Sequence, residues 1–126
     1  MKRFACLFTA LAACAPAHAD NLAKYPTVLR VEFVLGCMRD HKGSEYEMMS
    51  KCSCLLDALA RRFTVDQFVE ASTTSDAITI AGERGAALRD NEQARKLARR
   101  YREAVKDAEI GCFLRQPDES GEAEKK

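Results

Sequence analysis

The sequence has no tryptophan, and only one of its two histidines, His41, lies beyond the first nineteen residues. A Ser–His–Asp or Cys–His catalytic site needs a histidine base, so the chain has little from which to build one. The C-x2-C spacing of zinc sites does not occur. The pair Gly82 and Gly85 lacks the spacing of a phosphate-binding loop. The sequence therefore predicts a protein that is not an enzyme and has neither a cofactor nor a bound metal.

Net charge and long hydrophobic runs are also lacking. The 126 residues carry a formal net charge of +1, which argues against nucleic acid as a partner, because such binding requires a strongly positive field. After the first nineteen residues, no stretch approaches the roughly 18 consecutive apolar residues of a membrane-spanning helix. The length fits a single domain.

The N-terminus has the three parts of a secretory signal peptide, covering residues 1–19. Met1–Arg3 is positively charged, Phe4–Ala15 is apolar, and Ala17–Ala19 is a small-x-small cleavage motif. We expect cleavage after Ala19 and a soluble, periplasmic protein. A second interpretation is a lipoprotein signal, in which Cys14 at the end of Leu11–Cys14 carries a lipid anchor.

Four cysteines remain after such cleavage: Cys37, Cys52, Cys54 and Cys112. An even number in a small exported chain is typical of a disulfide framework. Cys52 and Cys54 lie two residues apart on an expected helix, so their side chains point about 200° apart and should not bridge each other. Cys52 is in phase with the apolar residues of its helix, and Cys112 with those of the last helix. This phasing favours Cys52–Cys112 and, by elimination, Cys37–Cys54.

The same region allows a metal interpretation. Soft ligands gather in Met48–Cys54, with Met38 and His41 nearby in the sequence, and such ligands suit Cu(I). Methionine is also a common residue of apolar cores. A soft-metal or thiol-redox protein that uses Cys52 and Cys54 is therefore an alternative hypothesis for the function.

Capping signals and hydrophobic spacing predict four to five helices and no strand. The expected helices cover about 27–40, 44–62, 64–72 and 90–112, with a short helix and then a loop between 73 and 89. Three of them open on an expected capping box: Ser44 with Glu47, Thr64 with Gln67, and Asp90 with Gln93. In the first helix the apolar residues recurring at helical spacing are Val28, Val31, Val34, Leu35 and Met38. We therefore predict an all-α, small disulfide-stapled helical bundle over residues 20–115 and a disordered tail over 116–126.

Two charged segments are candidates for contact with a partner. The first is the expected loop 81–85, whose glycines would present Glu83 and Arg84. The second is the polar face of the last helix, which could dock an acidic partner or an anionic membrane surface. Its candidate contact residues are Arg95, Arg99 and Arg102.

Five short strings are distributed over residues 25–112: Tyr25–Thr27 (YPT), Val31–Met38 (VEFVLGCM), Lys51–Cys54 (KCSC), Phe68–Ala71 (FVEA) and Gly82–Gly85 (GERG). Together they resemble a family of small exported four-cysteine helical proteins of proteobacteria, mostly uncharacterised, some of which are encoded near periplasmic quinoprotein alcohol dehydrogenases. The resemblance implies a periplasmic accessory or binding protein and brings no catalytic residues with it.

These observations predict a periplasmic, non-enzymatic binding or accessory protein that contacts another exported protein. A third hypothesis, beside the soft-metal or redox alternative, is a periplasmic immunity protein that neutralises a toxin. Small disulfide-bonded helical chains suit that role, although no residue here specifies a toxin.

Overall fold

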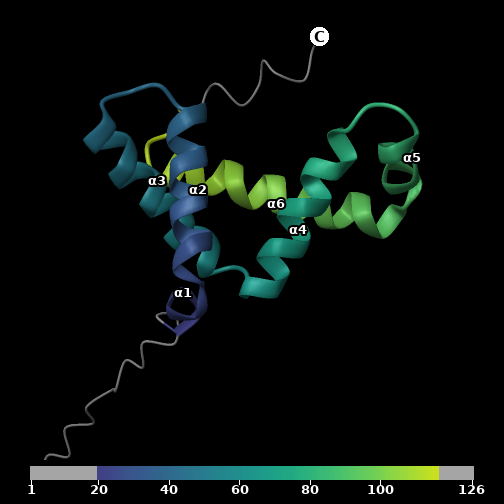
Figure 1. Cartoon of the computed structure of the whole chain (residues 1–126), viewed down its shortest axis with the longest axis horizontal. Coiled ribbons are helices and arrows are strands. Elements are labelled where there is room, and N and C mark those ends of the chain that lie inside the picture. Colours follow the sequence, from purple (N-terminus) through teal and green to yellow (C-terminus); the bar gives the residue numbers. More distant parts are fainter. Residues whose placement is uncertain (1–19, 117–126) are drawn as a thin grey trace, which may run out of the picture.

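The computed structural model describes residues 20–116, and within that range the chain is all-α. Its helices are α1 (Asp20–Lys24), α2 (Thr27–Asp40), α3 (Glu45–Ala60), α4 (Val65–Thr79), α5 (Glu83–Asp90) and α6 (Glu92–Gly111) (Figure 1). The predicted disulfide-tied helical fold is confirmed, with six helices in place of four to five. The predicted signal peptide lies outside the described residues, as does the predicted tail apart from its first residue, Gln116.

The additional helix and the shifted boundaries have local causes. The segment 20–24, which lies before the first predicted helix, forms the short α1, and α4 continues seven residues beyond its predicted end at Ser72. Serine and threonine are weak helix formers, but Ala71 and Ser75 are buried in α4, which packs along α6. Tertiary burial therefore extends α4 through a stretch whose composition suggested a break.

The capping predictions have three different outcomes. Thr64 opens α4 with a complete capping box with Gln67, as predicted. Ser44 precedes α3 without capping it, and its hydroxyl lies 3.4 Å from a carboxylate oxygen of Glu47. The third prediction is wrong by one residue.

The N-cap of α6 is Asn91 in place of Asp90. Its side-chain oxygen accepts hydrogen bonds from the backbone N–H groups of Gln93 at 2.9 Å and Ala94 at 3.1 Å. Asparagine is as good an N-cap as aspartate, so the sequence signal alone does not choose between the two neighbours.

The helices form two groups joined by α6. In one group α2 and α3, joined by a short turn into a helical hairpin, cross each other obliquely, and in the other α4 and α5 lie along the first half of α6 (Figure 1). The second half of α6 reaches back to α3. The long α6 therefore spans both groups and carries the buried residues Ala98, Ala104 and Ala108 on one face, as its predicted stripe requires.

Aromatic rings fill the junction of the two groups. Tyr25, Phe33, Phe63, Phe68 and Tyr101 make edge-on or tilted contacts, with ring centroids 5.5 to 6.0 Å apart. Tyr25 is only 1% exposed, and its hydroxyl donates a hydrogen bond to the Phe63 carbonyl at 3.1 Å. Each such ring pair contributes about 0.5–1.5 kcal/mol beyond its buried area. This cluster fixes the N-terminal end of α2 against α4 and α6.

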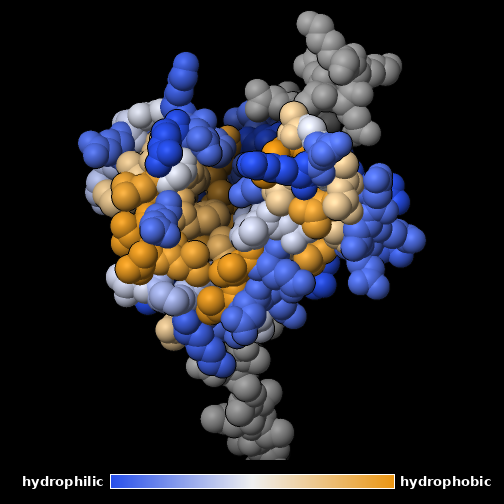
Figure 2. All heavy atoms as spheres, turned by 45° about the vertical axis from the view of Figure 1, so that its right-hand side comes forward, coloured by the Kyte–Doolittle hydropathy of each residue, from blue (hydrophilic) through white to orange (hydrophobic). Residues whose placement is uncertain are grey.

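The apolar stripe expected in the first helix has the right spacing but mostly faces outward. Val28, Val31 and Leu35 are exposed, whereas the side of α2 that packs against the core carries Leu29 and Phe33. The helix therefore has two apolar sides. Apolar side chains are plainly visible at the surface elsewhere too: Figure 2 shows a hollowed face with hydrophobic side chains gathered around the hollow.

No helix within residues 20–116 combines the length and the hydropathy required to cross a bilayer. This finding agrees with the sequence-based expectation for the same segment.

Candidate functional site

The four cysteines predicted to be bridged form two disulfides, but the favoured pairing was wrong. The bonds are Cys37–Cys52 and Cys54–Cys112. Cys52 and Cys54 do point to different neighbours, as their two-residue spacing requires. The side of α3 that carries Cys52 faces α2, its partner in the hairpin, while Cys54 faces the end of α6. The two disulfides indicate that the chain folds in an oxidising environment outside the cytosol.

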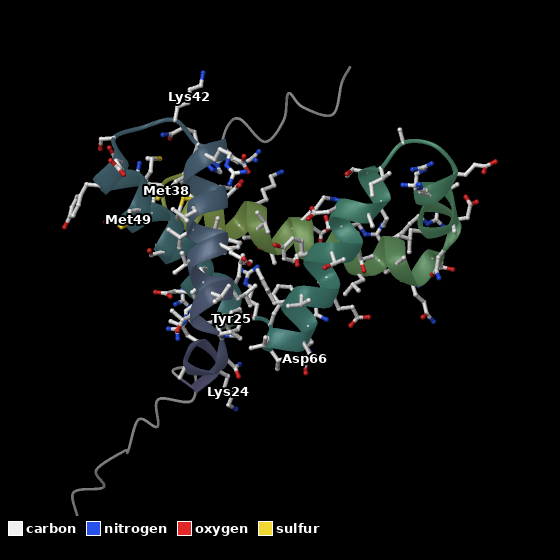
Figure 3. The ribbon with its side chains drawn as sticks, in the orientation of Figure 1. Lys24, Tyr25, Met38, Lys42, Met49 and Asp66 are labelled. Carbon is white, nitrogen blue, oxygen red and sulfur yellow. A yellow bond between two sulfur atoms is a disulfide. The ribbon has the colours of Figure 1, made fainter. Side chains whose placement is uncertain are left out.

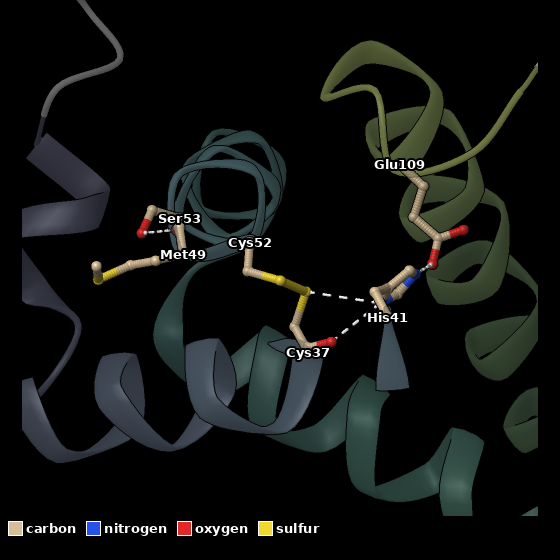
Figure 4. The surroundings of a disulfide bond; sticks show 6 residues. All are labelled: Cys37, His41, Met49, Cys52, Ser53 and Glu109. Carbon is tan, nitrogen blue, oxygen red and sulfur yellow. Dashed lines mark hydrogen bonds and ion pairs between the residues drawn. A yellow bond between two sulfur atoms is a disulfide. The ribbon is translucent and has the colours of Figure 1, made fainter. Parts of the chain in front are cut away.

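The one histidine in the described residues lies beside the first disulfide. His41 follows α2, and its ring Nδ1 is 3.0 Å from the Cys37 carbonyl oxygen, to which it can donate a hydrogen bond. Its Nε2 is 3.7 Å from an Oε of Glu109, a nearly buried carboxylate of α6 (Figure 4). The other Oε of Glu109 accepts from Arg115 Nε at 2.7 Å. Both ring nitrogens of His41 therefore face acceptor oxygens, one on α2 and one on α6, and the contact with Glu109 is an ion pair when the ring is protonated.

The soft ligands of the metal interpretation do not converge in the oxidised chain. The sulfurs of Cys52 and Cys54 belong to different disulfides, and Met49 points away from the Cys37–Cys52 bond (Figure 4). Met48 is buried. Among residues 20–116, no three His, Cys, Asp or Glu side chains are grouped as around a metal ion. A metal or redox role through Cys52 and Cys54 would first require reduction of both disulfides.

The predicted contact loop 81–85 is a helix start with a structural role. Gly82 has φ +80°, which glycine adopts at little cost, and it precedes the first turn of α5. Gly85 is buried, and a Cβ at that position would collide with the carbonyl oxygen of Ile80. Glu83 and Arg84 are both exposed on the first turn of α5. The prediction of a presenting loop was therefore wrong about its conformation, although both charged side chains reach solvent.

Arg89 also holds the turn between α4 and α5 together. Its guanidinium donates to the carbonyls of Ile78, Ile80 and Gly82 at 3.3, 2.6 and 2.8 Å. These carbonyls end α4 and lead into α5, where a cation is favoured by the helix dipole. Sequence reasoning missed Arg89, because its role depends on α5 folding back onto the end of α4.

The basic residues predicted on the last helix do form one surface. Arg95, Arg99 and Arg102 recur at intervals of four and three residues along α6, and Lys106 continues the series after four more. Residues at this spacing share one side of a helix. The three arginines are exposed and Lys106 is half-exposed. We call these four residues the α6 basic stripe; at 1.5 Å per residue it is about 16 Å long.

No residue of this stripe forms an ion pair within the described residues, although Glu103 lies on the same helix four residues after Arg99. The ion pairs involving neighbouring surface residues use other cations: Lys96 binds Glu92 at 2.7 Å, and Arg62 binds Asp107 at 3.1 Å. Arg100 lies over the Phe63 ring, 5.6 Å from its centroid. The stripe therefore carries four positive charges that no ion pair in residues 20–116 involves. Neither Glu83 nor Arg84 is joined to it by a hydrogen bond or ion pair in this range.

The clearest perturbed acid–base groups are two tyrosines in the aromatic junction. Burial raises the pKa of Tyr25 to about 12. Burial, together with the charges of Asp76 and Tyr25, raises the pKa of Tyr101 to about 12. Both phenols are therefore even harder to ionise than an ordinary tyrosine. We interpret them as packing residues, not as general bases.

A second surface, on the other helix hairpin, was not identified from the sequence. A groove of about 650 Å³ runs between α2 and α3, lined mainly by apolar side chains such as Val31, Leu35 and Met49. The spacing of the α2 residues was a signal for it, but spacing alone does not tell a core stripe from an exposed one.

Comparison of the chain with protein-family models, with curated protein sequences and with solved structures found no match.

Proposed function

We propose that this chain works in the bacterial periplasm as a non-enzymatic accessory protein that docks on another exported protein through the α6 basic stripe. The observation that carries the proposal is the stripe itself: four cations on one side of a regular helix, none of them in an ion pair within the described residues. Surface cations are commonly paired with nearby carboxylates on the same helix, and here the neighbouring Lys96 is.

The compartment is supported by the disulfides and by the N-terminal sequence. Two bridged cysteine pairs suit an oxidising environment. The charged, apolar and small-x-small segments of residues 1–19 add a secretory signal to this. A secretory signal together with two disulfides fits the periplasm.

Binding is favoured over catalysis because the histidine and the cysteines of the described residues already have partners within the chain. His41 is held between the Cys37 carbonyl and Glu109. All four cysteine sulfurs in the described residues are in disulfides, so none is available there as a thiolate nucleophile.

The partner surface that the stripe fits is acidic and at least three helical turns long. Arginine favours such contacts because its planar guanidinium binds carboxylates with two hydrogen bonds. Charge complementarity of this kind accelerates association and weakens as salt is added. We therefore expect partner binding that falls steeply with ionic strength.

A capture experiment tests the proposal. The tagged oxidised chain should retain a periplasmic protein at low salt and release it near 0.5 M salt, where screening shortens to a few ångströms. The triple variant Arg95→Glu/Arg99→Glu/Arg102→Glu should lose the same protein.

The matched control is Lys24→Glu/Arg39→Glu/Arg61→Glu, which changes the net charge equally at exposed positions off the stripe. It should retain the partner. Equal capture by both triple variants, or a partner that withstands high salt, would remove the stripe from the proposal.

A further inference from the structure

Helix α2 exposes a second apolar side, of which only Val34 and Met38, at its edge, also pack against the core. Val28, Val31 and Leu35 are 66%, 51% and 56% exposed, and with the half-buried Met38 they follow a 3-4-3 spacing. This is the repeat by which one helix packs along another. A helix normally turns an apolar stripe of this kind toward another element.

The uncovered side continues onto α3. Met38 of α2 and Met49 of α3 approach each other at the groove between the helices (Figure 3). Tyr46, 80% exposed, and Met49, 45% exposed, extend the apolar lining. We call this surface the α2–α3 face; its members are Val28, Val31, Val34, Leu35, Met38, Tyr46 and Met49. No residue of α6 lines the groove, so the α2–α3 face and the α6 basic stripe are separate surfaces.

Opposite charges line the two ends of the groove. Arg30 lies in the first turn of α2, whereas Glu45 is the first residue of α3, which follows the last turn of α2 after a short turn. Neither residue forms an ion pair within residues 20–116. The Nε of Arg30 is moreover buried without a hydrogen-bond partner there, which is costly for a charged donor. The groove is thus apolar along its middle, with an unpaired cation at one end and an unpaired anion at the other.

We propose that a second copy of this chain covers the α2–α3 face, in a two-fold symmetric dimer. A two-fold axis perpendicular to the groove reverses its direction, so Arg30 of each copy meets Glu45 of the other while the apolar middles face each other. Such an interface is isologous, the commonest kind in homo-oligomers. The two hairpins then make a four-helix arrangement, which buries the exposed sides of both α2 helices.

The size of the face sets the expected strength. The 14 residues of α2 are about 21 Å long, and two adjacent helices are roughly 20 Å wide. The projected area is then about 400 Å² per copy, or about 800 Å² for the two copies, and the accessible area of a ridged helical surface is larger. This places the dimer at or below the lower end of specific interfaces, which is about 1,200 Å² in total. We expect dissociation in the micromolar range.

The test is sedimentation velocity of the oxidised, processed chain over about 1 to 200 µM, a range that brackets micromolar affinity. The wild type should shift from monomer to dimer. Leu35→Glu puts a charge in the apolar middle and should weaken dimerisation by at least about tenfold. Val69→Glu, which changes another exposed apolar residue, on α4, should dimerise as the wild type does.

Charge reversal tests the two-fold geometry itself. Arg30→Glu and Glu45→Arg should each dimerise poorly, because every cross-interface pair then has like charges. Mixed together, the two variants should form a heterodimer tighter than either homodimer, since both pairs become attractive again. Because Glu45 is exposed, its variant remains informative even if Arg30→Glu fails to fold, as circular dichroism would show.

A wild type that stays monomeric at 200 µM would overturn the proposal, as would a mixture no tighter than its components. A monomer that instead binds an apolar helix of another exported protein at this face would assign the groove to a foreign partner. None of these outcomes touches the α6 basic stripe, so the two proposals can fail separately.

Discussion

Single residues decide how tightly α5 folds back onto α4. Gly82 supplies the left-handed backbone, Arg89 binds the carbonyls at the turn, and Gly85 lets the first turn of α5 approach Ile80. Each of these roles depends on contacts between segments that are close in space, so the sequence motif alone suggested an exposed loop. The glycines of this motif serve the turn, while its charged residues remain free to face solvent.

Gly85→Ala should destabilise the protein by about 1–3 kcal/mol, because the added methyl group has no room beside the Ile80 carbonyl. Gly36→Ala is the matched control: Gly36 lies inside α2 with open space around its Cβ position. It should stabilise the protein by about 0.5–1 kcal/mol through helix propensity. Urea unfolding monitored by circular dichroism measures both. Equal effects of the two substitutions would contradict the close approach.

At the scale of whole helices, the sequence predicted where most elements lie but not which sides they turn to one another. The bounds of α2, α3 and α6 could be predicted because their spacing and flanking residues are local signals. The sequence could not show which apolar side of α2 is buried. Leu29 and Phe33 on one side are as hydrophobic as Val28, Val31 and Leu35 on the other. The basic stripe could be predicted because the spacing of charges on one helix needs no knowledge of its neighbours.

The disulfide pairing depends on the same information. Phasing correctly separated Cys52 from Cys54 but assigned each to the wrong neighbouring helix. The short connection between α2 and α3 would have favoured Cys37–Cys52, because it brings these helices together as a hairpin. The two closures, at separations of 15 and 58 residues, stabilise the chain by about 3 and 4 kcal/mol in the loop-entropy picture.

Counting thiols in double variants distinguishes the pairings. In the chain from Asp20 onward, Cys37→Ala/Cys52→Ala should contain no free thiol, since Cys54 and Cys112 still bridge. Cys37→Ala/Cys54→Ala should contain two, because Cys52 and Cys112 face different neighbours. Alkylation under denaturing conditions followed by intact mass gives the number directly. The reverse result would restore the pairing expected from the sequence.

For the molecule as a whole, the aromatic junction is where the two helix groups meet. Tyr25 and Tyr101 lie within it and have pKa values raised to about 12 from an ordinary value near 10. A raised pKa in the folded state means that the neutral phenol stabilises the fold below pH 10. This contribution is lost as the pH rises from about 10 to about 12, because the unfolded chain ionises first.

We therefore expect the free energy of unfolding to fall over this pH range, with both helix groups unfolding together. Tyr101→Phe should flatten the fall, as it removes one of the two ionisations. Tyr46→Phe, at an exposed position away from the junction, should leave the slope as in the wild type. Urea midpoints between pH 8 and pH 11.5 test this, and an identical slope for all three proteins would contradict it.

The Cys54–Cys112 bond has a further consequence for how the chain responds to proteases. It closes a covalent ring that contains α4, α5 and all of α6, including the exposed stretch between Ile80 and Gly82. A single cut anywhere in that ring adds the mass of one water molecule and releases no fragment until a reductant opens the bond. A nicked copy therefore keeps both of its pieces joined for as long as the disulfide stays oxidised.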